Sequence, residues 1–324
     1  MHKNLTQKLN TPFKREVYEG LTASPKYLSS KYIYDKVGDK LFQDIMNMPE
    51  YYLTDTEFNI LETYKEQLAS LFGNSEKPFH LIEMGAGDGK KTKILLHHFI
   101  ARNLNFTFRP IDISQNALDS LQANLKQEIP ALQIEPLQGT YFETLKKLNF
   151  SSEERKVILF LGSNIGNLLH DKAIEFLSQI QAYMQSHDLL FIGFDQKKNP
   201  QTILDAYNDP TGITERFNKN LLVRINKELT ANFEVNNFTH WEVYDPESGT
   251  AKSYLVAQSP QQVRIEKLGL DINFDAFETI HTEISQKYDD KTVYWLAEQS
   301  GLKVLEKFSD KKHYYKNYLF TKSV

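Results

Sequence analysis

Three glycines at alternate positions are the residues of this sequence best suited to hold a ligand. The stretch from His80 to Lys93 reads HLIEMGAGDGKKTK, with glycines at 85, 87 and 89 between an apolar run and a helical pattern. Glycine is needed where the backbone takes a positive φ or where a ligand approaches closely. The first N–H groups of the following helix favour an acidic or polar ligand. The spacing predicts a strand, a ligand-binding turn and a helix; the alternative is a turn with a structural role only.

The spacing of these glycines differs from that of two common nucleotide-binding motifs. It is E-x-G-x-G-x-G with Glu83 at the end of the apolar run, whereas the dinucleotide fingerprint would need a glycine at Lys90. The sequence also lacks the P-loop pattern G-x-x-x-x-G-K-[ST]. The pattern resembles motif I of the Rossmann-like methyltransferases that bind S-adenosyl-L-methionine (SAM). A nicotinamide-dependent oxidoreductase is therefore disfavoured.

Composition argues against several classes of function. The chain has 324 residues, 40% of them hydrophobic, which suffices for about two packed domains. The net charge is -4 and no long basic run is present, so we expect no nucleic-acid partner. The absence of cysteine excludes disulfides, thiolate metal sites and a cysteine nucleophile. We expect no metal site, because His97 and His98 are adjacent on a helix and His240 and His281 have no companion at ligand spacing.

The sequence also bears on where the protein acts. No apolar run reaches the ~18 residues that a membrane span needs. The first twenty residues lack the apolar region of a secretory signal. We therefore expect a cytoplasmic protein with no membrane contact. We also expect a small-molecule partner and a monomeric state.

Alternating strands and helices from about residue 78 to 195 predict an α/β fold with a doubly wound parallel sheet. The apolar run at 156–161 is typical of a central strand covered on both faces. Asn167 follows its carboxyl end, where ligands bind in open α/β sheets. The strand expected at 106–113 ends near Asp112, where a carboxylate can meet ribose hydroxyls. Alternatively, Asp112 caps the next helix.

Two shorter patterns complete the expected elements of the sheet domain. Residues 132–137 are expected to form its third strand, ahead of Thr140 and Tyr141. Thr54 and Glu57 have the spacing of a capping box, which predicts the start of a long helix.

The segments on either side of this alternation predict a second domain. The region after residue 196 contains helices, then antiparallel strands, then a loop that holds Glu283 and Ser285. A helix and a terminal hairpin after residue 288 return to the sheet. We therefore place the sheet domain at 56–196 and 288–324, and a second α+β domain at 1–55 and 197–287.

Several distant segments, taken in order, resemble one family. They are YIYDKVGDKLF, MPEYYLTDTEFNIL, EMGAGDGKKTKILL, LGSNIGNL, DAYNDPTGITERFNKNLL and TEIS, and they extend from about residue 30 to 290. They resemble the histidine-specific Nα-methyltransferases of ergothioneine biosynthesis, which convert L-histidine to its trimethylated betaine, hercynine. The resemblance implies a Rossmann-like SAM-dependent methyltransferase sheet, a substrate-binding second domain and SAM as the cofactor.

Carried over position by position, the resemblance implies two groups of site residues. The residues that would hold SAM are Tyr34, Gly85, Lys91, Asp112, Thr140 and Tyr141. The residues that would hold the α-amine and carboxylate of the amino acid, and act in catalysis, are Tyr51, Asn167 and Tyr207. Glu283 and Ser285 would hold the imidazole ring, because a carboxylate accepts from a ring N–H and a hydroxyl can meet the other nitrogen. The family usually has an acid where Thr140 stands and an apolar ring-pocket residue near Ser253 and Tyr254.

Each assignment has a structural alternative. Tyr51 and Tyr207 can be ordinary half-buried tyrosines, Asn167 a helix cap and Glu283 a solvated acid. At the level of function, the alternatives are methylation of another amino acid or aromatic amine, and a SAM-binding scaffold without activity.

Overall fold

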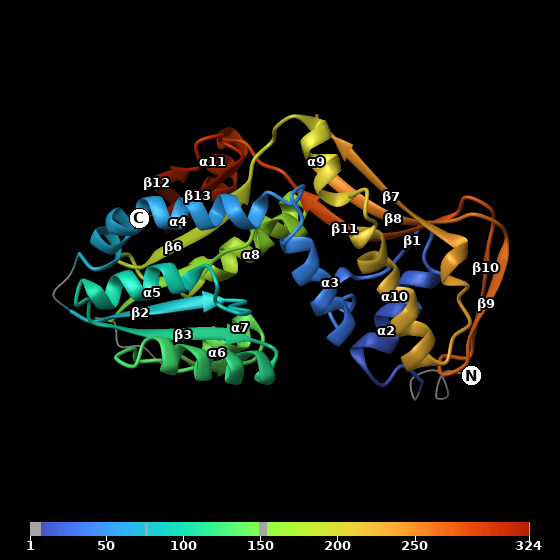
Figure 1. The fold of residues 1–324 in the computed structure, drawn as a ribbon, viewed down its shortest axis with the longest axis horizontal. Helices are drawn as coiled ribbons and strands as arrows, with labels where there is room; N and C mark the ends of the chain where they lie inside the picture. Colours follow the sequence, from blue (N-terminus) through green and yellow to red (C-terminus); the bar gives the residue numbers. More distant parts are fainter. Residues whose placement is uncertain (1–7, 75–76, 149–153, 324) are drawn as a thin grey trace. The chain divides into compact units, whose positions relative to one another are not determined.

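The computed structural model describes residues 8–74, 77–148 and 154–323. Its contacts divide the chain into two compact units (Figure 1). Unit 1 comprises Met1–Tyr52 and Lys198–Ser285, and unit 2 comprises Leu53–Lys197 and Gln286–Val324. The chain thus passes between units after residues 52, 197 and 285, where the sequence placed the boundaries after residues 55, 196 and 287.

Unit 2 is organised around a sheet of seven strands in the described part of the chain, in the order β12-β13-β6-β5-β2-β3-β4. The strands from β6 to β4 are parallel, and β13 is antiparallel to both β6 and β12. The strands are β2 (Phe79–Met84), β3 (Phe106–Asp112), β4 (Leu137–Gln138), β5 (Arg155–Phe160), β6 (Leu189–Asp195), β12 (Leu302–Ser309) and β13 (Tyr315–Lys322). The helices are α4 (Leu53–Phe72), α5 (Thr92–Ala101), α6 (Gln115–Glu128), α7 (Tyr141–Lys147), the short 3-10 helix η2 (Asn164–Asn167), α8 (His170–Ala182) and α11 (Asp290–Gln299).

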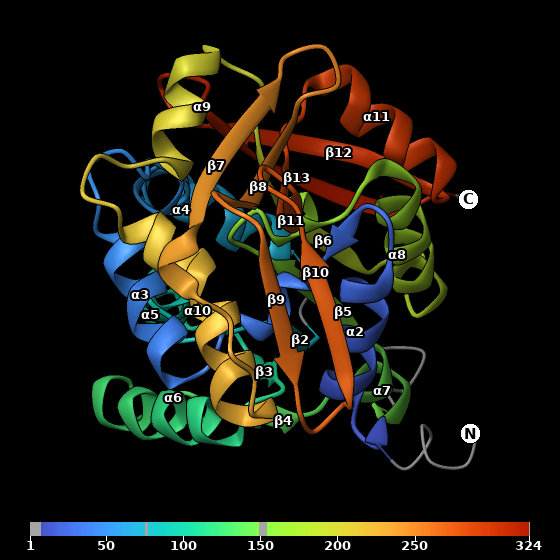
Figure 2. The same cartoon turned by 90° about the vertical axis from the view of Figure 1, so that its right-hand side faces the viewer.

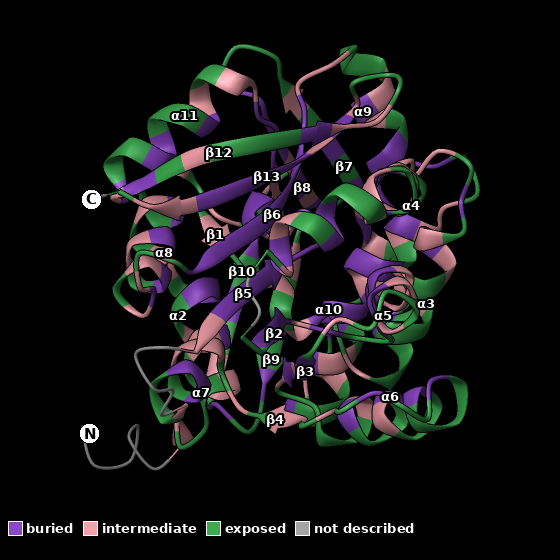
Figure 3. Cartoon of the chain, turned by 90° about the vertical axis from the view of Figure 1, so that its left-hand side faces the viewer, coloured by how far each residue is buried: buried purple, intermediate pink, exposed green. Residues whose placement is uncertain are grey.

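Helices cover both faces of this sheet, which explains the apolar runs of its central strands. Every residue of β2 and β6 is buried (Figure 3). On one face, α8 and α11 pack on a cluster that includes Ile158 and Ile192. On the other face, Phe72 of α4 contacts Phe99 of α5 and Phe191 of β6. The predicted doubly wound α/β fold is therefore confirmed.

The third strand is shorter than predicted. Only Leu137 and Gln138 pair with β3, and Ile134 makes an isolated bridge to Phe108. Pro110 of β3 lies between the two paired positions and has no N–H to donate to β4, which explains the gap.

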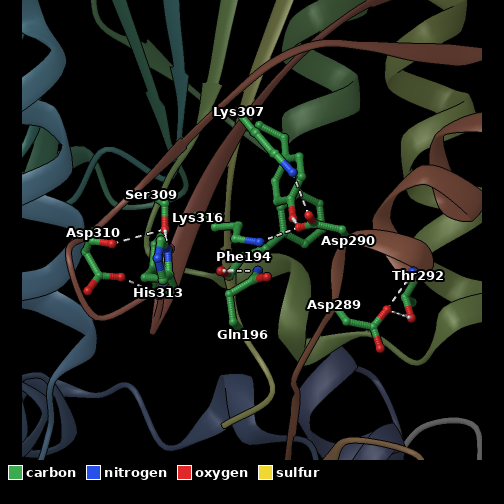
Figure 4. Close-up of polar contacts among 12 residues, drawn as sticks. Phe194, Gln196, Asp289, Asp290, Thr292, Lys307, Ser309, Asp310, His313 and Lys316 are labelled. Atoms are coloured by element: carbon green, nitrogen blue, oxygen red, sulfur yellow. Dashed lines mark hydrogen bonds and ion pairs between the residues drawn. The ribbon is translucent and has the colours of Figure 1, made fainter.

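Asp290 ties α11 to the terminal hairpin (Figure 4). Its carboxylate accepts hydrogen bonds from Lys307 Nζ at 2.6 Å, Lys316 Nζ at 2.5 Å and the Tyr318 hydroxyl at 2.6 Å. Although partial burial opposes ionisation, these donors hold the pKa of Asp290 well below its usual range. The carboxylate therefore fixes the last helix against β12 and β13.

Unit 1 contains a four-stranded sheet in the order β1-β11-β8-β7 and a separate hairpin, β9-β10 (Figure 2). The strands are β1 (Lys26–Tyr27), β7 (Phe238–Asp245), β8 (Thr250–Ala257), β9 (Gln261–Ile265), β10 (Leu270–Phe274) and β11 (Thr279–Gln286), whose last residue belongs to unit 2. The helical elements are α2 (Pro12–Thr22), η1 (Ser30–Tyr32), α3 (Lys36–Met46), α9 (Pro200–Tyr207), α10 (Ile213–Leu229) and η3 (Val235–Asn237). Phe217, Leu221 and Ile225 of α10 belong to the hydrophobic core of this unit.

The loop predicted around Glu283 and Ser285 is a strand. Both residues lie in β11, where Ile280 pairs with Lys26 of β1. The prediction of a loop was wrong because the pairing partner of this polar segment lies far away in the sequence. Alternate residues of a strand share a face, so Glu283 and Ser285 project to one side of β11 and Thr282 to the other.

Candidate functional site

The glycine turn in unit 2 links β2 to α5. Gly85 and Gly87 have φ values of 76° and 53°, in the left-handed region that favours glycine. A Cβ on Gly85 would lie 2.7 Å from the hydroxyl oxygen of Tyr141, whereas a Cβ on Gly87 would meet nothing within 4 Å. Gly85 is therefore required by a close neighbour, while Gly87 borders open space at the end of the strand.

Asp112 lies beside this turn, at the end of β3. Its Oδ2 accepts a hydrogen bond from the Gly87 N–H at 3.4 Å, and its Oδ1 accepts from the Ser114 N–H at 2.9 Å. Ser114, not Asp112, is the N-cap of α6, since its hydroxyl oxygen accepts from the Ala117 N–H. The alternative in which Asp112 caps this helix is therefore wrong, and the half-buried carboxylate stands next to the turn.

Tyr141 is the first residue of α7 and lies against Gly85. Burial, followed by the negative charges of Asp112 and Glu83, raises the pKa of Tyr141 to about 12. Its hydroxyl is therefore protonated at neutral pH and can donate a hydrogen bond. The exposed Thr140 directs its hydroxyl to Glu143 Oε2 at 2.7 Å.

Glu83, the acid of the glycine motif, is in the core. Its Oε1 accepts from the Thr92 hydroxyl at 2.5 Å, and Oε2 has no hydrogen-bond partner among the described residues. Burial raises the pKa of Glu83 to about 8. This carboxyl group is therefore mostly neutral at pH 7.

Lys91 is held by a residue to which sequence reasoning gave a different role. The Lys91 ammonium donates to Oε2 of Glu57 at 2.5 Å. Glu57 is fully buried in α4. Because α4 begins at Leu53, Thr54 already lies inside the helix, and the predicted capping box is wrong. The sequence did contain one indication that Glu57 is buried, because this charged residue shares a helix face with the apolar residues Ile60 and Leu61.

Asn167 ends η2, the short helix that follows β5. The chain reaches this helix through Gly162 and Ser163, which both have positive φ values, of 80° and 56°. Asn167 is exposed and caps neither flanking helix, because Ser163 and Leu168 bound η2 and Leu169 is the N-cap of α8. The helix-cap alternative for Asn167 is therefore wrong.

In unit 1 the structure brings together three of the residues assigned to the amino acid. The rings of Tyr51 and Tyr207 meet edge to face, with centroids 6.2 Å apart. The hydroxyl of Tyr207 lies 2.7 Å from Oγ of Ser285. Tyr207 is 8% exposed and packs with Ile203 and Ala251. A helix end and a strand thus present neighbouring hydroxyl groups, and Glu283 shares the strand face of Ser285.

Tyr34 belongs to the same unit as these residues. Its ring lies 5.5 Å from that of Phe42 and 5.4 Å from that of Phe217, between centroids. Phe42 in turn lies 6.4 Å from Tyr51. A continuous row of rings therefore connects Tyr34 to Tyr51 and Tyr207.

The neighbourhood in which we expected an apolar ring-pocket residue is polar. Ser253 is buried and donates to Glu242 Oε2 at 2.6 Å. The ring of Tyr254 lies 5.4 Å from that of His281. The hydroxyl of Thr282 donates to Asn218 Oδ1 at 2.6 Å, which fixes the opposite face of β11.

The described residues offer neither a metal-binding cluster nor a membrane-spanning helix. Residues 8–74, 77–148 and 154–323 contain no group of three or more His, Asp or Glu side chains that could hold a metal ion. In the same residues, no helix combines the length and the apolar character of a membrane span.

Comparison with known proteins gives long matches. At 35% identity, the chain matches a histidine N-alpha-methyltransferase of Mycolicibacterium smegmatis over 92% of its own length and 91% of the relative's. A protein of the same name from Mycobacterium tuberculosis is 33% identical over the same shares. The ergothioneine biosynthesis protein 1 of Schizosaccharomyces pombe is 31% identical over 91% of this chain and 39% of that protein.

The family assignment agrees with these matches. The sequence model described as "Histidine-specific methyltransferase, SAM-dependent" matches residues 13–322. This range includes every residue that the resemblance assigned to a site. The chain therefore belongs to the family of histidine-specific, SAM-dependent methyltransferases.

Proposed function

We propose that this protein transfers methyl groups from SAM to the α-amino nitrogen of L-histidine and that the final product is the trimethylated betaine, hercynine. The observation that carries the proposal is the 35% identity to a histidine N-alpha-methyltransferase over nearly the full length of both chains. The cluster of Tyr51, Tyr207 and Ser285 supports it, because its hydroxyl groups suit a small polar substrate.

Unit 2 carries groups that fit SAM. Asp112 can accept from the ribose hydroxyls, as a carboxylate at the end of the second strand does in related folds. Gly85 and Gly87 allow a ligand to approach the backbone, and the protonated Tyr141 can donate beside them. Lys91, at the start of α5, has the charge needed to meet the carboxylate of the cofactor's methionine part. Thr140 takes the position where the family usually has an acid, and backbone N–H groups there would serve the adenine.

The proposal assigns the amino acid to the remaining residues. Tyr51, Asn167 and Tyr207 would hold its amine and carboxylate, since an amide and two hydroxyls can accept from one and donate to the other. Glu283 would accept from the imidazole N–H and Ser285 would meet the other nitrogen. In our proposal Tyr34 closes the cofactor site.

The chemistry requires orientation more than covalent catalysis. Bound SAM supplies an activated methyl group on a sulfonium. The acceptor must be a neutral amine, so the site must favour loss of a proton from the ammonium form, and water or a tyrosine oxygen receives that proton. In the first two transfers, a hydrogen bond from the amine N–H to the Asn167 amide oxygen directs the nitrogen lone pair. The neutral tertiary amine that accepts the third methyl has no N–H, so its orientation depends on the contacts of its carboxylate and ring. In well-oriented systems, proximity supplies up to about 7–11 kcal/mol of the barrier reduction.

Mass spectrometry of an amino-acid mixture incubated with the protein and SAM tests the proposal. We expect mass gains of one, two or three methyl groups on histidine and none on the other amino acids. Fragmentation of the product should place every methyl on the α-nitrogen, because the imidazole ring would be occupied by Glu283 and Ser285.

The same experiment separates the alternatives. Equal methylation of tryptophan or tyrosine would favour another amino acid or aromatic amine as acceptor. Binding of SAM without turnover of any amino acid would favour a scaffold. We further propose that the protein is cytoplasmic and monomeric. Size exclusion coupled to light scattering tests the monomeric state, because it measures whether the mass in solution is that of one chain.

A further inference from the structure

Glu57 is a buried carboxylate that the proposed function does not yet explain. It lies on α4 with no exposed surface. Within the described residues, four groups donate to it. Oε2 accepts from Lys91 Nζ at 2.5 Å and from the Gly162 N–H at 2.7 Å. Oε1 accepts from the Tyr315 hydroxyl at 3.0 Å and from Asn317 Nδ2 at 2.9 Å.

The central strand β6 leaves space for this carboxylate. A Cβ on Gly193 would lie 2.2 Å from both Glu57 Oε1 and the Tyr315 hydroxyl oxygen. A glycine inside a strand weakens the strand and often marks a close approach by another group. Here that group is the carboxylate of Glu57, and only a glycine at position 193 leaves room for it against β6.

A buried ionised carboxylate is costly unless it is paired and fully hydrogen-bonded. Of its four donors, two lie at the carboxyl edge of the sheet. Lys91 is the N-cap residue of α5, behind the glycine turn, and Gly162 lies in the turn after β5. Ligands bind outside this edge in open α/β sheets. A Cβ on Gly162 would lie 3.3 Å from Lys91 Nζ, so the two groups are neighbours.

We infer that Glu57 is a positioning residue of the cofactor site, which fixes the ammonium of Lys91 where it meets the carboxylate of the methionine part of SAM. One oxygen of Glu57 holds Lys91 and Gly162 at the edge, and the other anchors the carboxylate to β13. The inference rests on the proposed function, because it needs SAM at this edge of the sheet.

Positioning depends on the reach of the side chain rather than on its charge, and two substitutions separate these properties. Glu57→Gln keeps the length. Its amide oxygen can accept from Lys91 and Gly162, while its NH₂ donates to Tyr315 and to Asn317. Asn317 Oδ1 is buried and has no partner among the described residues, so rotation of the Asn317 amide makes it available. Glu57→Asp keeps the charge but withdraws the acceptor from Lys91 by one methylene.

The test is isothermal titration calorimetry with two ligands and no turnover. S-adenosylhomocysteine carries the methionine carboxylate, and 5′-methylthioadenosine lacks it. We expect Glu57→Asp to weaken S-adenosylhomocysteine binding by about tenfold, as loss of a hydrogen bond to a charged group does. Binding of 5′-methylthioadenosine should change by less than about twofold. Glu57→Gln should bind both ligands within about threefold of the unchanged protein.

Lys91→Met and Tyr315→Phe serve as comparison variants. Lys91→Met should reproduce the selective loss of Glu57→Asp, and the double variant should lose no more than either one, because both act through one ammonium. Tyr315→Phe removes one of the two donors on the far oxygen and should lower the melting temperature. Because Asn317 still holds that oxygen, S-adenosylhomocysteine binding should weaken less than in Glu57→Asp.

The outcomes distinguish failure of the proposed function from failure of the role inferred for Glu57. If the unchanged protein fails to bind S-adenosylhomocysteine, the proposed function is overturned and this inference with it. If it binds, any of three results overturns the inference alone. One is that Glu57→Asp binds S-adenosylhomocysteine as tightly as the unchanged protein does, and another is that it loses equal affinity for both ligands. The third result is that Glu57→Gln binds S-adenosylhomocysteine more weakly than Glu57→Asp does.

Discussion

The hydroxyl of Tyr207, at the end of α9, lies 2.7 Å from Oγ of Ser285 in β11. The two residues are 78 positions apart in the sequence. Their contact joins a residue that the proposal assigns to the amine to one that it assigns to the imidazole. If the proposal holds, the two ends of the substrate would be recognised by side chains that are hydrogen-bonded to each other within unit 1.

This contact predicts coupled effects of two substitutions. Tyr207→Phe removes the hydroxyl and leaves the ring contact with Tyr51, and Ser285→Ala removes the partner. We expect each to lower kcat/KM for histidine by about tenfold. The double variant should lose less than the product of the two effects, because both act through one hydrogen bond.

Steady-state methyl transfer measures these effects, and binding of S-adenosylhomocysteine should be unchanged. Tyr18→Phe makes the same chemical change in a half-buried tyrosine elsewhere in unit 1 and should leave kcat/KM as it is. An unchanged kcat/KM in both Tyr207→Phe and Ser285→Ala would refute the assignment of these residues to the substrate.

Asn167→Ala should reduce turnover and spare cofactor binding. If the amide oxygen directs the amine, its loss leaves the nitrogen free to turn, and misplacement of a reacting group costs on the order of 10²-fold in rate. Calorimetry with S-adenosylhomocysteine should give the same affinity as the unchanged protein. Asn105→Ala, at another exposed asparagine of unit 2, is the matched control and should be neutral in both assays. Normal kcat/KM in Asn167→Ala would contradict its role.

Asp112→Asn should weaken the binding of every ligand that carries the ribose. We expect a loss of about tenfold for both S-adenosylhomocysteine and 5′-methylthioadenosine, because a charge-assisted hydrogen bond becomes a neutral one. This pattern differs from the selective loss expected for Glu57→Asp. Asp119→Asn makes the same charge change on the exposed face of α6 and should have no effect. Equal affinities in Asp112→Asn and the unchanged protein would place the ribose elsewhere.

The raised pKa of Glu83 predicts that the stability of the fold depends on pH. Burial raises the pKa of Glu83 from 4.5 to about 8 in the folded protein. A carboxyl group whose pKa is raised on folding contributes its full stability below pH 4.5, and this contribution is lost as the pH rises towards 8. Each unit of difference in pKa corresponds to about 1.4 kcal/mol. Glu83→Gln keeps a partner for Thr92 but cannot ionise, so it should not show this loss.

Melting temperatures of the two proteins between pH 5 and 9 measure the effect. The difference between Glu83→Gln and the unchanged protein should shift in favour of the variant as the pH rises. All other groups titrate in both proteins, so a difference that stays constant across this range would show that Glu83 ionises normally in the fold.

Much of the sheet domain was predictable because its signals are local. The apolar run of β2 and the glycine spacing lie next to each other in the sequence, and together they specify strand, turn and helix. The run at 157–161 is apolar throughout because β5 is covered on both faces. The parallel direction of the strands from β6 to β4 follows from the helical crossovers that such alternation requires.

The residues that were misread depend on partners far away. The donors to Glu57 lie 34, 105, 258 and 260 positions along the chain, so its local spacing with Thr54 suggested only a helix cap. Likewise, β11 is a strand because β1 and β8 flank it, although Ile280 and Thr282 at alternate buried positions were a signal of it. Tertiary partners, not local propensity, decide such elements.

The position of β13 has a consequence for any experiment that alters the C-terminal segment. This strand lies between β6 and β12, and it supplies Tyr315 and Asn317 to Glu57. During synthesis, the place of β13 between β6 and β12 stays empty until residues 315–322 have left the ribosome. Deletion of these few residues would therefore remove an inner strand, and the orientation of a lysine more than two hundred residues earlier would be lost with it.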